Sequence, residues 1–246
     1  MESLLNAKGL GKRFGAHDAL AGVDFELGSG ELLGLLGPNG AGKTTTLKLL
    51  LGMLRPTSGS ASVLGFDCTE ASLEVKRRIG YSPDEPAFYN FLTGRETIDF
   101  ASEMRGVARA DAWAEIEPMI RALDFSEQLE VLTSNYSHGM KKKLALLLAL
   151  AHRPKVLLLD EPTNGLDPPT AHAVKELLIE KAAQGAGILL STHLLEMADR
   201  MCTRVMILHR GTIVARGSVA DVRARAGVAP EASLEDAFLK IVSSPT

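Results

Sequence analysis

The octapeptide Gly37-Pro38-Asn39-Gly40-Ala41-Gly42-Lys43-Thr44 satisfies the pattern G-x-x-x-x-G-K-[ST]. Its glycines let backbone N–H groups turn toward phosphate oxygens, an approach that side chains would block. An apolar run at Glu31–Leu36 precedes the octapeptide and a helical pattern at Thr44–Met53 follows it. Since a helix N-terminus attracts anions, this arrangement predicts a loop that binds the phosphates of a nucleotide.

Individual side chains of the loop have predicted roles in binding ATP and Mg²⁺. Lys43 is expected to reach the β- and γ-phosphates, and the hydroxyl of Thr44 to ligate Mg²⁺. Thr45 is counted with them as part of the nucleotide site. Chance would produce such a match in about one chain of this length in a hundred. The flanking strand and helix make the functional interpretation much the stronger one.

A second acidic motif stands further along the chain, where the apolar run Val156–Leu159 ends in Asp160 and Glu161. Side chains alternate between the two faces of a strand, so these carboxylates diverge and can serve different purposes. Asp160 is predicted to hold Mg²⁺, directly or through water. Glu161 is predicted to polarise the attacking water as general base. Together with the phosphate loop, the pair predicts that the chain hydrolyses ATP.

Composition and charge limit the class of protein. The 246 residues are 46% hydrophobic and 23% charged, which is typical of a soluble globular protein, and the net charge of -3 gives no basic footprint for nucleic acid. Cys68 and Cys202 lack metal-ligand spacing and are expected to be reduced thiols. The longest apolar run, Leu144–Ala151, is far shorter than the ~20 residues of a bilayer helix, and Met1–Lys12 lacks a signal-peptide core. We therefore expect a cytoplasmic chain unless a membrane partner holds it.

The remaining pattern predicts an α/β chain interrupted by a helical stretch at Leu92–Ala151. In this stretch, Thr93 and Glu96 form a capping box, and Pro118 implies a kink or a boundary in the helix Asp111–Leu123. Elsewhere we expect strands at Leu4–Lys8, Ala19–Leu27, Ser60–Leu64, Lys76–Tyr81, Val156–Leu159, Gly187–Ser191, Arg204–Leu208 and Thr212–Arg216, and helices at Pro168–Gln184 and, after a polar linker, Leu234–Val242.

Four further motifs resemble those of ABC ATPases. Tyr136–Met140 is similar to the signature sequence of that family, and Thr163–Pro168 is similar to its D-loop. Ser191-Thr192-His193 resembles the segment with the switch histidine, and Phe14 stands where the family places an aromatic ring against adenine. The motifs occur in the order of the family, and the resemblance extends from about Leu4 to Gly217.

The resemblance implies a fold and its division. The fold class is an α/β P-loop NTPase core, a RecA-like mixed sheet with an N-terminal antiparallel β region, into which an all-helical subdomain is inserted. Residues 1–246 would form a single nucleotide-binding domain. Its ATP-binding core would comprise residues 1–84 and 152–217, its helical subdomain residues 85–151 and its C-terminal helical extension residues 218–246.

The resemblance also implies a head-to-tail pair of such domains, most simply a homodimer, with two ATP molecules between them. Ser137 and Gly139 of one subunit would cap the ATP held by the phosphate loop of the other. A serine N-cap suits this purpose, because the helix that follows it presents free N–H groups to the γ-phosphate. His193 would hydrogen-bond the γ-phosphate, and Phe14 would stack on adenine. We expect structural roles for His17, His152, His172 and His209.

Two positions depart from the family pattern. His138 replaces the second residue of the signature sequence, which is usually glycine. Asp84 replaces the glutamine of the Q-loop; it could reach Mg²⁺ through water, or Glu85 next to it could take that role. Lys141–Lys143 is interpreted as the solvated face of its helix.

Three segments are similar to the exporter-type ABC-2 subfamily: Glu85–Ile98, Tyr136–Met140 and Leu234–Phe238. They predict an ATP-hydrolysing subunit on the cytoplasmic face of the cell membrane that energises a separate permease, for export. The helical insertion and Asp84–Leu92 would contact the permease.

The alternative is a soluble ABC ATPase of DNA repair or translation, although a second site, a long coiled coil and zinc cysteines are missing. A GTPase would need an Asn-Lys-x-Asp sequence, which is also missing. The cargo is left open.

Overall fold

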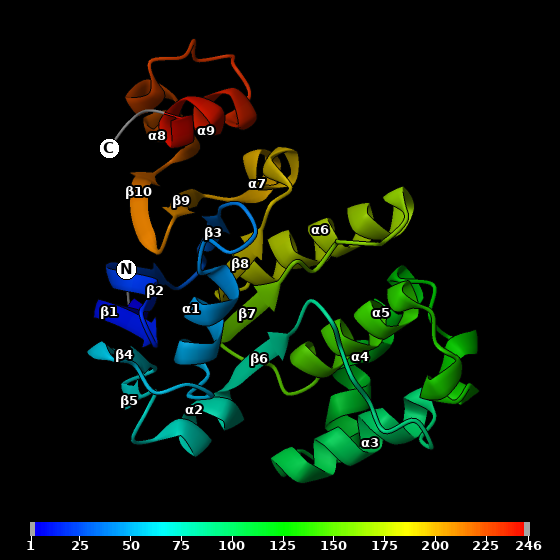
Figure 1. The fold of residues 1–246 in the computed structure, drawn as a ribbon. Coiled ribbons are helices and arrows are strands. Elements are labelled where there is room, and N and C mark those ends of the chain that lie inside the picture. The colour runs from blue at the N-terminus through cyan, green and yellow to red at the C-terminus, as the bar shows by residue number, and fades with distance from the viewer. Residues whose placement is uncertain (1–2, 244–246) are drawn as a thin grey trace.

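The computed structural model describes residues 3–243, which form two sheets surrounded by helices (Figure 1). The N-terminal sheet is antiparallel, with strand order β2-β1-β4-β5. The central sheet has the order β10-β9-β3-β8-β7-β6 and is parallel except for the edge strand β10. The strands are β1 (Ser3–Phe14), β2 (His17–Gly28), β3 (Leu32–Leu36), β4 (Ser58–Val63), β5 (Phe66–Asp67), β6 (Ile79–Ser82), β7 (Val156–Asp160), β8 (Gly187–Thr192), β9 (Arg204–His209) and β10 (Thr212–Gly217).

Helices α3, α4 and α5 lie to one side of the central sheet, and α8 and α9 lie at the opposite end of the molecule (Figure 1). Two 3-10 turns, Glu127–Glu130 and Thr133–Asn135, connect α4 to α5. The helices are α1 (Lys43–Leu50), α2 (Ser72–Arg78), α3 (Gly94–Arg105), α4 (Arg109–Ala122), α5 (His138–Leu150), α6 (Pro168–Ala183), α7 (Leu195–Met201), α8 (Val219–Ala226) and α9 (Leu234–Ser243).

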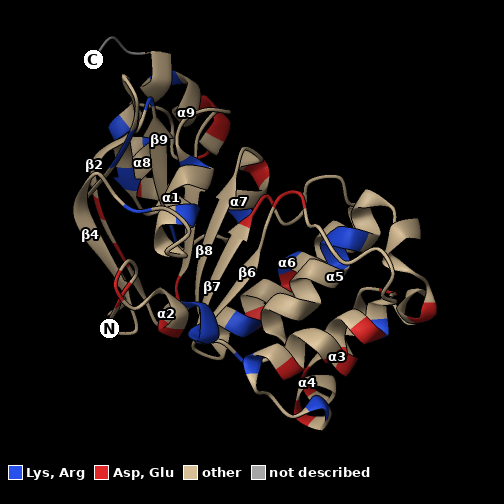
Figure 2. Cartoon of the chain, turned by 60° about the horizontal axis from the view of Figure 1, so that its bottom comes forward, with Lys and Arg blue, Asp and Glu red and all other residues tan. Residues whose placement is uncertain are grey.

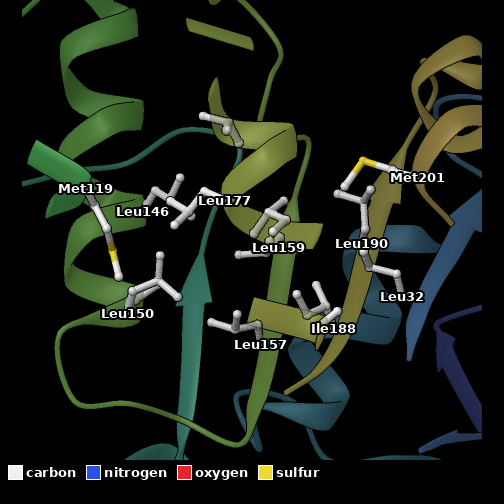
Figure 3. Close-up of a cluster of buried hydrophobic side chains, with 14 of the residues drawn as sticks. Leu32, Met119, Leu146, Leu150, Leu157, Leu159, Leu177, Ile188, Leu190 and Met201 are labelled. Atoms are coloured by element: carbon white, nitrogen blue, oxygen red, sulfur yellow. The ribbon is translucent and has the colours of Figure 1, made fainter. Parts of the chain in front are cut away.

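The central sheet is buried on both faces, which explains why its strands are continuous apolar runs. In β7, Leu157 and Leu159 belong to one buried cluster, whereas Val156 and Leu158 belong to the other. This alternation follows from the pleat, which points successive side chains to opposite faces. One cluster packs the sheet against α4, α5 and α6, as Figure 3 shows, and the other packs it against α1 and the N-terminal sheet.

The helices inserted between β6 and β7 share a core with the sheet. Met119 of α4 and Leu146 and Leu150 of α5 lie in the same buried cluster as Leu157 of β7 (Figure 3). At Gly80 of β6 the approach is so close that a Cβ atom there would lie 2.1 Å from the carbonyl oxygen of Ala149. Only glycine permits this contact without a shift of the backbone, so the C-terminal end of α5 is held directly against the sheet.

The predicted fold class is confirmed: an α/β P-loop NTPase core with a mixed sheet, an N-terminal antiparallel region and a helical insertion. The capping box at Thr93 is also present. Two details were wrong: Lys76–Arg78 is helical rather than extended, and α8 occupies the expected polar linker. Of the two outcomes predicted for Pro118, the boundary is excluded, because α4 continues through this residue. None of the helices within residues 3–243 combines the length and the apolar character needed to cross a bilayer.

Candidate nucleotide-binding site

The phosphate loop leads from β3 into α1, as predicted, and its backbone is open to an anion. Gly42 has φ 111° and a Cβ atom there would lie 2.5 Å from the carbonyl oxygen of Ala19, so this position requires glycine. Within residues 3–243, no side chain caps the N-terminus of α1. The first N–H groups of the helix therefore remain available to phosphate oxygens.

Lys43 is buried among groups that determine its charge. Its Nζ donates hydrogen bonds to the carbonyl oxygens of Gly37, at 2.7 Å, and of Pro38, at 3.3 Å. Burial lowers the pKa of Lys43, and the nearby carboxylates of Glu161, Asp160 and Asp84 oppose that shift. A triphosphate would bring further negative charge to this ammonium group, so the site is built to favour a polyanion.

Thr44 and Asp160 are brought together from distant parts of the chain. The Thr44 hydroxyl donates to Oδ2 of Asp160 at 2.9 Å, and the Ser191 hydroxyl donates to Oδ1 of the same carboxylate. These are hard oxygen donors of the kind that Mg²⁺ prefers. Residues 3–243 contain no group of three His, Cys, Asp or Glu side chains placed to hold a metal. That donor set suits Mg²⁺, which binds through one or two protein oxygens and completes its shell with substrate phosphate and water.

Glu161 is held in one orientation by the end of β8 and the residue that follows it. Its Oε2 accepts a hydrogen bond from the Thr192 hydroxyl at 2.9 Å, and its Oε1 accepts one from the backbone N–H of His193 at 3.0 Å. Nδ1 of His193 is 2.8 Å from the same Oε1, and Nζ of Lys43 is 3.9 Å from it. The carboxylate is only 6% exposed and faces the phosphate loop.

A cavity of about 350 Å³ joins most of the predicted residues. Phe14, at the end of β1, is half-exposed and lines this cavity. His17 also lines the cavity, in contrast to the structural role predicted for it, and it lies at the start of β2 directly after the β1–β2 turn. The remaining lining residues are Ala19, Pro38, Asn39, Gly40, Gly42, Lys43, Thr44, Thr45, Asp84, Asp160 and Glu161.

Other predicted residues lie outside this cavity. Gly37 and Ala41 support the loop from behind, and Ala41 is buried in the apolar cluster under it. Ser137 and Gly139 stand at the start of α5, where Ser137 Oγ accepts a hydrogen bond from the N–H of Met140 at 3.2 Å. Ser137 is exposed there, and neither residue lines the cavity of its own chain.

Asp84 and Lys142 form a contact that the sequence did not suggest. Nζ of Lys142 donates to Oδ1 of Asp84 at 2.7 Å. The interpretation of Lys141–Lys143 as a solvated face was wrong for Lys142, which is 2% exposed. The helix buries this lysine because a carboxylate and a backbone carbonyl are within reach of its ammonium group.

Residues 20–164 match the family described as ABC transporter. The chain is 38% identical over 220 residues to the uncharacterized ABC transporter ATP-binding protein YxlF of Bacillus subtilis, covering 89% of this chain and 72% of that protein. It is 37% identical over 222 residues to a fluoroquinolones export ATP-binding protein of Mycobacterium tuberculosis, with the same coverage of 89% and 72%. A solved structure described as the ATP-binding subunit of an ABC transporter superposes with a TM-score of 0.91 at 35% identity, covering 97% of this chain and 99% of the other. The chain therefore belongs to the ABC transporter family, as one of its ATP-binding subunits.

Proposed function

We propose that the chain hydrolyses ATP with Mg²⁺ and thereby energises a membrane permease. The observation that carries this proposal is the buried Glu161 carboxylate, held by Thr192 and His193 and facing the phosphate loop. A carboxylate fixed in this way is suited to accept a proton from a water molecule that attacks the γ-phosphate.

The residues around Glu161 have distinct roles in this proposal. The loop N–H groups and Lys43 bind and orient the phosphates, which is the main contribution a protein makes to phosphoryl transfer. Thr44 and Asp160 would hold Mg²⁺, which supplies positive charge at the phosphate oxygens. His193, whose Nδ1 lies 2.8 Å from Oε1 of Glu161, helps to orient the carboxylate and would hydrogen-bond the γ-phosphate. Phe14 offers a ring face to adenine.

The site is completed by a second copy of the chain in this proposal. Ser137 and the start of α5 are exposed and point no group into their own cavity. A head-to-tail homodimer would place Ser137 and Gly139 of each copy against the ATP of the other. The first N–H groups of α5 would then face the γ-phosphate, an anion that a helix N-terminus favours.

An exposed apolar surface between Tyr89 and α3 fits a permease. We call Tyr89, Phe91, Phe100 and Met104 the aromatic patch. The ring of Tyr89 lies 5.7 Å from that of Phe91 and 5.6 Å from that of Phe100, between ring centroids. Phe91 is 74% and Met104 73% exposed. The patch begins five residues after Asp84, so a cytoplasmic segment of a permease bound there would contact a segment that reaches the nucleotide cavity.

Export and a place on the cytoplasmic face of the membrane complete the proposal. The relative from Mycobacterium tuberculosis is described as an export protein. Lysine, arginine, aspartate and glutamate all occur over the helical part of the molecule, as Figure 2 shows, although the charged residues of α5 are all lysines. That distribution favours a protein partner over nucleic acid and does not support a role in DNA repair or translation.

The purified chain is expected to release phosphate from ATP only when Mg²⁺ is present. Chelation by EDTA should abolish the release, and excess Mg²⁺ should restore it. Without a cation, the negative phosphates would face the carboxylates of Asp160 and Glu161 with no positive charge between them. A colorimetric phosphate assay measures both states. Release that persists in EDTA would contradict the Mg²⁺ requirement, and no release with Mg²⁺ would contradict the ATPase assignment.

Phe91→Asp is expected to remove the chain from the membrane fraction of cells that make the whole transporter. A charge placed in the aromatic patch opposes burial against a permease. The ATPase activity of the isolated chain should stay within about twofold, since Phe91 lies outside the nucleotide cavity. Leu239→Asp is the matched control, because Leu239 on α9 is 57% exposed and α9 lies at the opposite end of the molecule from α3 (Figure 1). Equal loss of both variants from the membrane, or loss of neither, would contradict the docking surface.

A further inference from the structure

Lys142, the middle residue of Lys141–Lys143, is buried, and burial of a charged side chain is costly unless the charge is paired. Its side chain has no exposed area, and its ammonium group lies between two acceptors. Nζ donates to Oδ1 of Asp84 at 2.7 Å and to the backbone carbonyl oxygen of Glu161 at 2.7 Å. A buried cation with these partners links α5, the segment after β6 and the main chain of Glu161.

The backbone of Glu161 needs such support. Its φ is 47°, in the left-handed region that a residue with a Cβ atom disfavours. Its N–H donates to the carbonyl oxygen of Ser191 at 2.9 Å, and its carbonyl oxygen accepts from the N–H of Asn164 at 3.1 Å as well as from Lys142. The hydrogen bond from Lys142 is charge-assisted and therefore the stronger of the two at that oxygen.

Asp84 supplies the opposite charge and lines the nucleotide cavity together with Asp160 and Glu161. Its Oδ1 also lies 3.5 Å from Nδ2 of Asn164, in the motif that follows Glu161. An unpaired Asp84 would be a third carboxylate facing the incoming phosphates. The ion pair with Lys142 neutralises that charge before ATP arrives.

We propose that Lys142 is a positioning residue for hydrolysis, which holds the main chain of Glu161 in place with Asp84 as its counter-charge. The inference rests on the proposed ATPase function. It assigns to Asp84 the role of ion-pair partner of Lys142 rather than that of a Mg²⁺ ligand. Ser137 lies five residues before Lys142 in the same helical segment. Lys142 thereby connects the first turns of α5 to the main chain of Glu161.

Lys142→Met tests the proposal, because methionine fills a similar volume without a donor or a charge. We expect kcat to fall at least tenfold, while the dissociation constant of a fluorescent ATP analogue changes less than threefold. The phosphate loop does not contact Lys142, which is why binding should survive. Lys143→Met is the matched control: Lys143 lies on the same helix and donates to a backbone carbonyl, that of Leu123, away from the cavity. Its kcat should stay within twofold of wild type.

The double variant Asp84→Asn with Lys142→Met separates positioning from charge balance. With both charges removed, the midpoint of thermal unfolding should return close to that of wild type, so this variant folds even if Lys142→Met alone does not. Its kcat should stay at least tenfold low, because the carbonyl of Glu161 still lacks its donor. Recovery of kcat together with stability, or a kcat of Lys142→Met equal to that of Lys143→Met, would overturn the proposal. Phosphate release by the wild type, measured in parallel, tests the ATPase function separately.

Discussion

Glu161→Gln is expected to lower ATP turnover about a thousandfold and to leave ATP binding intact. Loss of a positioned general base typically costs a factor of 10² to 10⁴. The amide retains the shape of the carboxylate, and after rotation its oxygen can accept from the N–H of His193 while its NH₂ donates to the Thr192 hydroxyl. The fold should therefore survive, and only the proton acceptor is lost. Phosphate release and binding of a fluorescent ATP analogue measure the two effects.

The same variant should form a dimer with Mg-ATP. The head-to-tail pair would close around two ATP molecules, and without hydrolysis it would not reopen. Light scattering, with and without nucleotide, is the measurement. Glu176→Gln, at a side chain that is 57% exposed on α6, is the matched control and should keep wild-type turnover. Unchanged turnover in Glu161→Gln would remove Glu161 from the role of base. A monomer in the presence of Mg-ATP would mean that the permease or a different ATPase subunit is needed to close the site.

Lys43→Met is expected to weaken ATP binding at least a hundredfold. Lys43 is the lysine of α1 whose ammonium group reaches the phosphate loop. Hydrogen bonds from a charged group contribute about 1.5–3 kcal/mol each. The variant also frees the carbonyl oxygens of Gly37 and Pro38 that Lys43 holds. Titration with a fluorescent ATP analogue measures the loss.

The stability of the ATP-free Lys43→Met protein provides a second check. Burial lowers the pKa of Lys43 in spite of three nearby carboxylates, so folding disfavours its charged form. Removal of that charge should leave the midpoint of thermal unfolding unchanged or raise it. Lys48→Met, at an exposed lysine on the same helix, should leave both binding and stability as they are. Affinity equal to that of Lys48→Met would show that Lys43 does not contact the phosphates.

Sequence reasoning was most successful where a signal is local. The phosphate loop, β3 and α1 follow from a contiguous stretch, and Ser137 and Thr93 cap the helices that their motifs predict. The short helices α2, α7 and α8 were not predicted, because seven or eight residues span only two turns and give little periodicity. The helix around Pro118 was predicted as Asp111–Leu123, close to the observed bounds of α4, and the proline does not end it.

The candidate site shows the same division between local and distant signals. Each sequence motif identifies its own functional residues, but the motifs do not indicate which residues of different motifs are in contact. The pairing of Lys142 with Asp84 joins positions 58 residues apart, and the hydrogen bond from Thr44 to Asp160 joins positions 116 apart. Three consecutive lysines normally indicate a solvated helix face, and only the tertiary contact shows that the middle one is buried.

The contact between Gly80 and Ala149 makes α5 a lever. The helix is fastened to the central sheet near its C-terminal end, while Ser137 stands at the other end, about 18 Å away at 1.5 Å per residue. A tilt of about 10° at the fastening would move Ser137 by about 3 Å, the length of one hydrogen bond. A rotation of this size is thus large enough to make or break a contact between the start of α5 and a phosphate.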